Sequence, residues 1–268
     1  MAEVDEGKRV ETDGRENNDK VVQDEAILAQ QDRIEKEIAE CTELIGDKED
    51  LCLLKKEYSD EDQVYQQKLR DLMSRYSHIR KTRGDGNCFY RGFGYGYLEC
   101  LLSDEVERKR FTDIAAQSKE NLVALGFPSF TIEDFHDTFM DVIEKVDSMS
   151  VPELLDTFRD QGLSDYLVVY LRLLTSGQLQ KETEFFENFV EGGLSVKDFC
   201  NREVEPMGKE SDHIHIIALT KALGVGVRVE YMDRVEGGKI NHHDFPEGCD
   251  PQVTFLYRPG HYDILYHS

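Results

Sequence analysis

A cysteine follows a short, polar, glycine-bearing stretch within Arg83–Arg91, and the residues after it are apolar at near-helical spacing. This pattern predicts a loop that leads into a helix, with Cys88 in the first helical turn. Free backbone N–H groups and the positive end of the helix dipole favour a thiolate there, and the thiolate is the nucleophile. The same N–H groups would stabilise an oxyanion. The alternative is a small buried cysteine beneath a helix, the commoner fate of a single cysteine.

A histidine and an aspartate stand two positions apart within Tyr257–Tyr266. The preceding Arg-Pro-Gly indicates a turn, and the alternating residue types after it indicate a half-buried strand. A period of two residues places His261 and Asp263 on one face of that strand. An imidazole beside a carboxylate is the base and orienting group that a cysteine nucleophile needs. Alternatively, the strand is structural and His261 is a surface histidine.

Together, the two motifs Asp85–Arg91 and Gly260–Asp263 resemble those of the ovarian-tumour (OTU) family of deubiquitinating cysteine proteases. Within that family the chain is similar to the otubains, and the segment before the motifs resembles the amino-terminal extension of the longer otubains. The resemblance covers nearly the whole chain from Ile27 onward. It also rests on five interior blocks: Lys81–Arg83, Phe130–Phe135, Tyr166–Arg172, Glu203–Met207 and Ser211–Ile217.

The resemblance implies an α+β, papain-like OTU fold, with a helical body packed on a small, mainly antiparallel sheet and the nucleophile at a helix N-terminus. Cys88 would attack an isopeptide carbonyl, His261 would transfer the proton, and Asp263 would orient the imidazole. Asp85 belongs to the active-site motif. It either takes part through its carboxylate or holds the loop whose N–H groups form the oxyanion hole. No metal or organic cofactor is required.

The resemblance also implies a substrate and a partner. Such otubains cleave lysine-48-linked polyubiquitin; they also bind ubiquitin-conjugating enzymes and block ubiquitin transfer without catalysis, which limits the DNA-damage response. Matching positions place Phe189, Glu191, Glu205, Pro206, His215 and Tyr262 near the distal ubiquitin. Phe130, Thr131 and Phe135 would face the conjugating enzyme. For each of these residues an ordinary core or surface position is the alternative, above all for Phe135 and Phe189, whose helical spacing already explains them.

Composition narrows the classes of partner. The 268 residues suffice for one large domain or two small ones, and the net charge of −23 argues against nucleic acid and against anionic membranes. Six cysteines without CxxC pairs, and a start without a signal-peptide pattern, predict a cytoplasmic or nuclear protein with free thiols. No histidine or cysteine spacing is typical of zinc, so we expect no structural metal. We expect a monomer.

Periodicity divides the chain into three parts. Residues 1–23 are acidic and polar, which predicts a disordered tail. Residues 24–45 carry a partial apolar stripe that predicts an amphipathic helix; it either packs on the domain or orders on ubiquitin or another partner. Residues 46–268 would be the OTU catalytic domain, with helices up to Leu223 and strands at 225–231, 253–257 and 261–266. A helical face spans Tyr65–Tyr76, and Ser59 would open its capping box with Asp62.

Three functions remain compatible with these patterns. The first is a deubiquitinating cysteine protease. The second is a binding protein that sequesters a ubiquitin-conjugating enzyme, and the third is a papain-like acyltransferase that acts on another amide. The intact set of Cys88, His261 and Asp263 favours the first function but does not exclude the second.

Overall fold

The computed structural model describes residues 41–234 and 239–268, together with Gln30, Arg33, Lys36, Glu37 and Ala39. The chain divides into two compact units, residues 1–42 and 43–268. In the first unit the described residues from Gln30 to Cys41 are helical and exposed. The predicted disordered tail, residues 1–23, lies outside the described residues. No helix among the described residues is long and apolar enough to cross a membrane.

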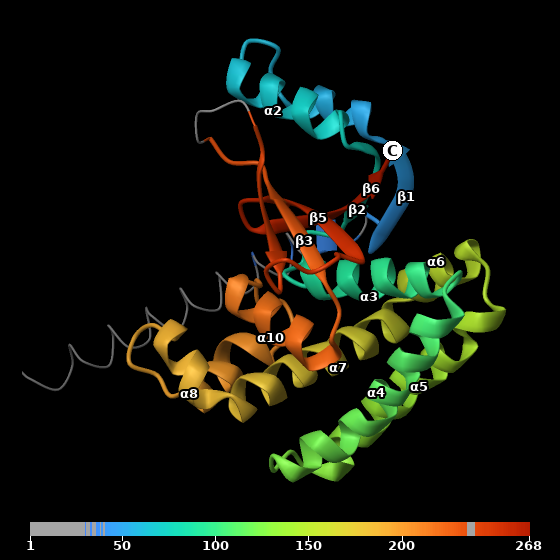
Figure 1. Cartoon of the computed structure of the whole chain (residues 1–268), viewed down its shortest axis with the longest axis vertical. Helices are drawn as coiled ribbons and strands as arrows, with labels where there is room; N and C mark the ends of the chain where they lie inside the picture. Colours follow the sequence, from blue (N-terminus) through green and yellow to red (C-terminus); the bar gives the residue numbers. More distant parts are fainter. Residues whose placement is uncertain (1–29, 31–32, 34–35, 38, 40, 235–238) are drawn as a thin grey trace, which may run out of the picture. The chain divides into compact units, whose positions relative to one another are not determined.

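The second unit contains one six-stranded sheet in the order β1-β2-β6-β5-β3-β4 (Figure 1). The strands are β1 (Ile45–Asp50), β2 (Tyr76–Thr82), β3 (Val227–Tyr231), β4 (Asn241–Phe245), β5 (Val253–Arg258) and β6 (His261–His267). Among the described strands, only the β3–β5 pair is parallel; the other four neighbouring pairs are antiparallel. The strand that begins at His261 therefore lies inside the sheet, between β2 and β5.

Most of the other elements of this unit are helices. The α-helices are α2 (Gln63–Met73), α3 (Cys88–Leu101), α4 (Glu105–Ala124), α5 (Ser129–Lys145), α6 (Val151–Arg159), α7 (Gln161–Lys181), α8 (Thr183–Phe186), α9 (Val196–Phe199) and α10 (His213–Leu223). Short 3-10 turns are η1 (Leu51–Glu57), η2 (Val146–Ser148) and η3 (Glu187–Phe189), and η4 (Cys200–Val204) is a π-helical turn. The predicted α+β fold, a helical body on a mainly antiparallel sheet, is confirmed.

Two apolar layers enclose the sheet. The larger layer joins α3 to residues of α4, α5, α6 and α7, and α3 lies directly on the sheet through Phe89 and Phe255 (Figure 1). The smaller layer joins η1 and α2 to the sheet through Leu54, Leu69 and Leu265. Because both faces of the sheet are buried against apolar side chains, the sheet forms a central support for the residues at its strand ends.

The interior glycines of α3 allow its close packing. A Cβ on Gly92 would lie 2.8 Å from the Phe255 ring, and one on Gly94 would lie 3.1 Å from the Phe158 ring. Both distances are shorter than an ordinary carbon–carbon contact. An interior glycine costs roughly 0.5–1 kcal/mol relative to alanine. Here the absence of side chains at Gly92 and Gly94 allows α3 to fit between the sheet and helix α6.

Several local predictions are wrong. Ile45 does not end a helix: it is buried, and it opens β1 opposite Thr82. Tyr76 belongs to β2 rather than to the helical face, because α2 ends at Met73. The side chain that caps α2 is Asp62, which accepts a hydrogen bond from the Tyr65 amide. For Ile45 and Tyr76, pairing with a strand that is distant in sequence overrides the local helical pattern. For α2, a capping residue closer to the helix takes the place of Ser59.

Candidate active site

Cys88 is the first residue of α3, as the sequence predicts, and only 4% of it is exposed. The turn before it is possible because Gly86 adopts φ 74°, which glycine accepts without strain. The N-cap residue, Asn87, makes no side-chain cap bond to the helix. Within the described part of the chain, the backbone N–H of Cys88 has no hydrogen-bond acceptor, so it remains available for an oxyanion.

His261 and Asp263 meet as the period of two predicts. The His261 Nε2 and the Asp263 Oδ1 are 2.9 Å apart. Burial lowers the pKa of His261, but its hydrogen bonds with Asp263 and with Cys88 outweigh burial and raise that pKa to about 10. The contact with Cys88 joins residues from α3 and β6 that are far apart in sequence. Cys88, His261 and Asp263, the residues predicted as nucleophile, base and orienting carboxylate, therefore form one chain of contacts.

Asp263 is fully buried and has three donors. Its Oδ1 accepts from the Thr82 backbone amide at 3.0 Å as well as from His261, and its Oδ2 is paired with Arg258. Burial favours the neutral acid, but these donors prevail and lower the pKa of Asp263. The carboxylate is therefore ionised and fixed in orientation. Neither Thr82 nor Arg258 was assigned a role from the sequence, although Arg258 ends the strand that precedes His261.

Asp85 holds the turn before Cys88. Its Oδ1 accepts from the Asn87 amide at 2.9 Å, and its Oδ2 accepts from Arg91 Nη1 at 2.6 Å. Arg91 is fully buried and also reaches Asp165 and Ser164 on α7. Of the two roles considered for Asp85, these contacts support the loop-holding one. They also occupy the Asn87 N–H, whereas the neighbouring Cys88 N–H stays available for the predicted oxyanion.

A second loop packs directly on this turn. The Gly208 amide donates to Asn87 Oδ1 at 2.9 Å, and a Cβ on Gly86 would lie only 2.0 Å from the Gly208 oxygen. This loop follows η4 and includes Glu205 and Pro206, two of the predicted ubiquitin-binding residues. The turn that carries the nucleophile and the loop predicted to meet substrate are thus in van der Waals contact.

The variant Gly86→Ala tests that contact. We expect it to lower the free energy of unfolding by at least about 1 kcal/mol more than Gly192→Ala, because overpacking adds to the backbone cost. Gly192 is a matched control: it has the same φ of 74°, and no atom of the described residues lies within 4 Å of an added Cβ. Urea denaturation of both variants measures the difference. Equal losses would show that the two loops separate without cost.

The predicted ubiquitin-binding residues fall into two groups. Phe189, Glu191 and Tyr262 line one open hollow of about 460 Å³, together with residues of α10 and β3. Glu205 and Pro206 lie partly exposed on the loop after η4, where Glu205 accepts from Ser176 at 2.6 Å. His215 is buried, and its Nδ1 accepts from the Asp212 amide, so it supports the wall of this hollow from within.

The residues predicted to face a conjugating enzyme lie on α5. Phe130 is 89% exposed, and Thr131 beside it is also exposed. Phe135 is half-buried, with its ring 4.9 Å from that of Tyr166. An aromatic side chain that is almost wholly in water is the strongest interaction signal among these residues.

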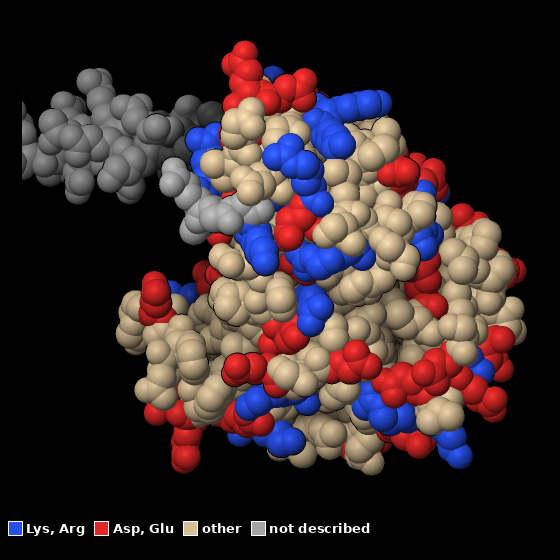
Figure 2. Space-filling model, turned by 45° about the horizontal axis from the view of Figure 1, so that its top comes forward, with Lys and Arg blue, Asp and Glu red and all other residues tan. Residues whose placement is uncertain are grey.

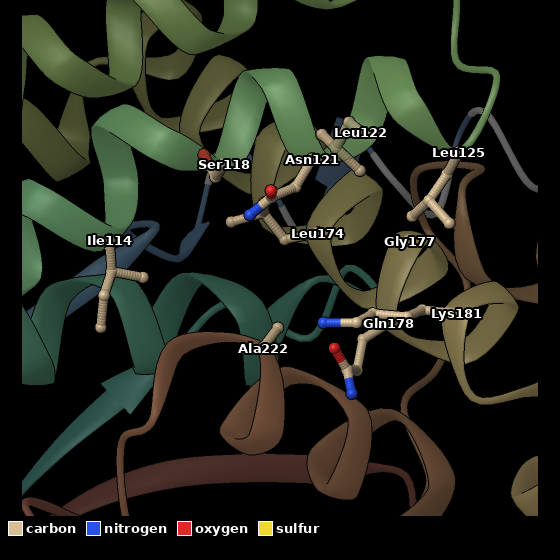
Figure 3. Close-up of a pocket in the computed structure, with 10 residues that line it drawn as sticks. All are labelled: Ile114, Ser118, Asn121, Leu122, Leu125, Leu174, Gly177, Gln178, Lys181 and Ala222. Carbon is tan, nitrogen blue, oxygen red and sulfur yellow. The ribbon is translucent and has the colours of Figure 1, made fainter.

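A smaller pocket lies apart from Cys88, among α4, α7 and α10 (Figure 3). Its volume is about 80 Å³, and Leu122, Leu174 and Ala222 supply apolar walls. A Cβ on Gly177 would lie 2.5 Å from the Leu122 side chain, so this space is a tight helix junction. None of the residues predicted for catalysis or ubiquitin binding lines it.

A cysteine at a helix N-terminus, faced by a strand-borne histidine and aspartate, is the arrangement of papain-like cysteine hydrolases. The Peptidase C65 Otubain family model matches residues 37–267, so this chain belongs to that family. Ubiquitin thioesterase OTUB1 from Homo sapiens, and the same protein from Mus musculus, are each 63% identical over 244 residues, which cover 91% of this chain and 90% of the relative.

Solved structures agree with this assignment. A complex of h/ceOTUB1 with ubiquitin aldehyde and UBCH5B~Ub superposes with a TM-score of 0.88 at 38% identity, over 92% of this chain and 99% of the other. The corresponding complex with UBC13~Ub gives a TM-score of 0.87 at the same identity and the same coverage.

Proposed function

We propose that this protein is a cysteine-type ubiquitin isopeptidase that hydrolyses lysine-48-linked polyubiquitin. The observation that carries the proposal is the continuous contact from Cys88 through His261 to the buried Asp263. The relatives described above support the substrate class, because they are named ubiquitin thioesterases and are 63% identical to this chain.

The mechanism follows from these contacts. The Cys88 thiolate attacks the isopeptide carbonyl, and the Cys88 N–H at the start of α3 stabilises the resulting oxyanion. His261 holds the thiol proton and delivers it to the departing lysine amine, while Asp263 fixes the imidazole and stabilises its cation. Water activated by His261 then hydrolyses the thioester. The open hollow lined by Phe189, Glu191 and Tyr262 would receive the distal ubiquitin.

A panel of diubiquitins, one for each linkage, tests this function. We expect the lysine-48-linked dimer to be cleaved fastest. Cleavage of no dimer by folded protein would favour the second candidate, a binding inhibitor. Absence of reaction with a ubiquitin-derived electrophile would instead favour an acyltransferase that acts on another amide.

The second candidate function, binding of a ubiquitin-conjugating enzyme, is supported by a specific observation and is compatible with the first. Phe130 is 89% exposed, and the superposed OTUB1 structures contain UBC13~Ub and UBCH5B~Ub. In the view of Figure 2, acidic and basic side chains are interspersed. An exposed aromatic side chain of this kind suits a protein partner.

The variant Phe130→Ala tests this contact. Removal of a hot-spot aromatic side chain typically costs 2 kcal/mol or more of binding, so we expect affinity for a ubiquitin-loaded conjugating enzyme to fall on the order of 30-fold. Diubiquitin cleavage and the unfolding midpoint should be unchanged, because Phe130 has few contacts to lose. The control is Val106→Ala on α4, where the side chain is 82% exposed. Similar small effects of both variants on affinity would contradict the assignment.

A further inference from the structure

Arg172, on α7, is fully buried and carries out no proposed chemical step. Every hydrogen bond that it makes among the described residues goes to an uncharged oxygen. Its Nη1 donates to the Val204 carbonyl at 3.0 Å, and its Nη2 is shared by the Lys209 carbonyl at 2.7 Å, Asn87 Oδ1 at 2.8 Å and the Gly86 carbonyl at 3.0 Å. A buried cation without a carboxylate partner is costly, so these contacts call for an explanation.

The contacts of Arg172 connect two segments. Gly86 and Asn87 belong to the turn before Cys88. Val204, the last residue of η4, and Lys209 belong to a stretch that we call the 204–210 loop (residues 204–210). The same two segments also touch through the Gly208 amide, which donates to Asn87 Oδ1. One guanidinium therefore fastens the 204–210 loop to the turn of the nucleophile.

The peptide between Gly86 and Asn87 is held at both ends. Its carbonyl accepts from Arg172, and its N–H donates to Asp85 Oδ1 at 2.9 Å. Glycine populates both signs of φ, so a peptide next to Gly86 can rotate unless it is fastened. Rotation would displace the adjoining Cys88 N–H from the direction of the developing charge. The two opposed contacts keep a single orientation.

We infer that Arg172 is a positioning residue for the oxyanion site, and that it couples the 204–210 loop to that site. The inference rests on the proposed isopeptidase function. Glu205 and Pro206, predicted to meet the distal ubiquitin, lie in this loop. A substrate that presses on the loop therefore acts, through the Arg172 guanidinium, on the peptide that sets the oxyanion donor.

The test compares Arg172→Lys with the wild type in two reactions. An ammonium keeps the charge but lacks the planar fork that reaches several oxygens at once. We expect kcat for a ubiquitin C-terminal fluorogenic amide to fall on the order of 10²-fold, as for loss of an oxyanion donor, with little change in KM. Alkylation of Cys88 by iodoacetamide needs the thiolate but no oxyanion site, so its rate should be nearly unchanged. Arg80→Lys, at another buried arginine, should leave kcat unchanged.

Two results would overturn the inference while the wild type remains active: an unchanged kcat, or equal losses of hydrolysis and alkylation. A wild type that is alkylated at Cys88 but hydrolyses no ubiquitin substrate would overturn the proposed function itself, and this inference with it. If Arg172→Lys does not fold, the variant Gly208→Ala tests the coupling instead, because Gly208 joins the 204–210 loop to Asn87. Within the described part of the chain, its added Cβ has only the Asp85 backbone oxygen within 4 Å, at 3.8 Å, but the φ of 79° strains the loop. An unchanged kcat in that folded variant would contradict the coupling.

Discussion

Replacement of the nucleophile, Cys88→Ala, should reduce hydrolysis of lysine-48-linked diubiquitin by at least about 10⁴-fold, because it removes the thiol that lies beside His261 and would form the thioester. The fold should persist, since the change removes one buried sulfur atom from the first turn of α3 and leaves the helix backbone intact. Affinity for diubiquitin should also persist, because the hollow lined by Phe189, Glu191 and Tyr262 is untouched. Gel-resolved cleavage and a binding titration measure the two quantities separately.

The matched control is Cys200→Ala. Cys200 is also buried, and burial raises the pKa of its thiol to about 11, so it remains protonated at neutral pH. We expect this variant to keep its cleavage rate although it loses some stability to the cavity. If Cys200→Ala lost cleavage and Cys88→Ala kept it, the nucleophile assignment would be wrong.

The variant Asp263→Asn should lower kcat on the order of 10²- to 10⁴-fold, because an amide neither fixes the imidazole tautomer nor stabilises its cation. It should also change the pH dependence of stability. In the wild type the pKa of His261 is raised from 6.5 to about 10. The resulting stability is complete below pH 6.5 and is lost as the pH rises through about 10. Without the carboxylate this loss should shrink, as urea denaturation across that range would show.

Asp244→Asn provides the control for Asp263→Asn. Asp244 on β4 also pairs with an arginine, Arg228, at 2.7 Å, and it too has a lowered pKa, mainly through that pair. Its strand, β4, is an edge strand and is separated from β6 by β5 and β3. We expect unchanged kcat. Comparable losses of kcat in both variants would mean that the effect of Asp263→Asn comes from general weakening of the sheet.

The catalytic helix and strand could be predicted because their evidence is local. A polar turn followed by helical spacing places Cys88 at the start of α3, and a period of two places His261 beside Asp263. The α+β fold followed from the resemblance and from the switch between helical and strand periodicity. These parts of the site depend on residues that are neighbours in the sequence.

The parts that support the site could not be predicted, because they depend on pairing across the chain. The β2 sequence is polar and charged, so it gives no strand pattern; only its pairing with β6 brings the Thr82 amide to Asp263. Arg172 stands inside an apolar run, between Leu171 and Leu173, and the sequence alone does not show what a charge there would contact. Its role becomes visible only when α7 meets the 204–210 loop. Such contacts have no short-range signature.

The place of β6 between β2 and β5 also determines when activity can arise during synthesis. Both neighbours of β6 precede it in the chain, and the nucleophile precedes it by more than half of the sequence. A nascent chain that ends before His261 would already contain α3 with Cys88. It would lack the proposed base, His261, and the edges of β2 and β5 that pair with β6 would be unpaired. Such a chain is chemically silent and open to edge-to-edge association. Ribosome-stalled chains that end before His261 should therefore require a chaperone to remain unaggregated. Hydrolase activity should arise only when β6 pairs with β2 and β5 and brings His261 to Cys88.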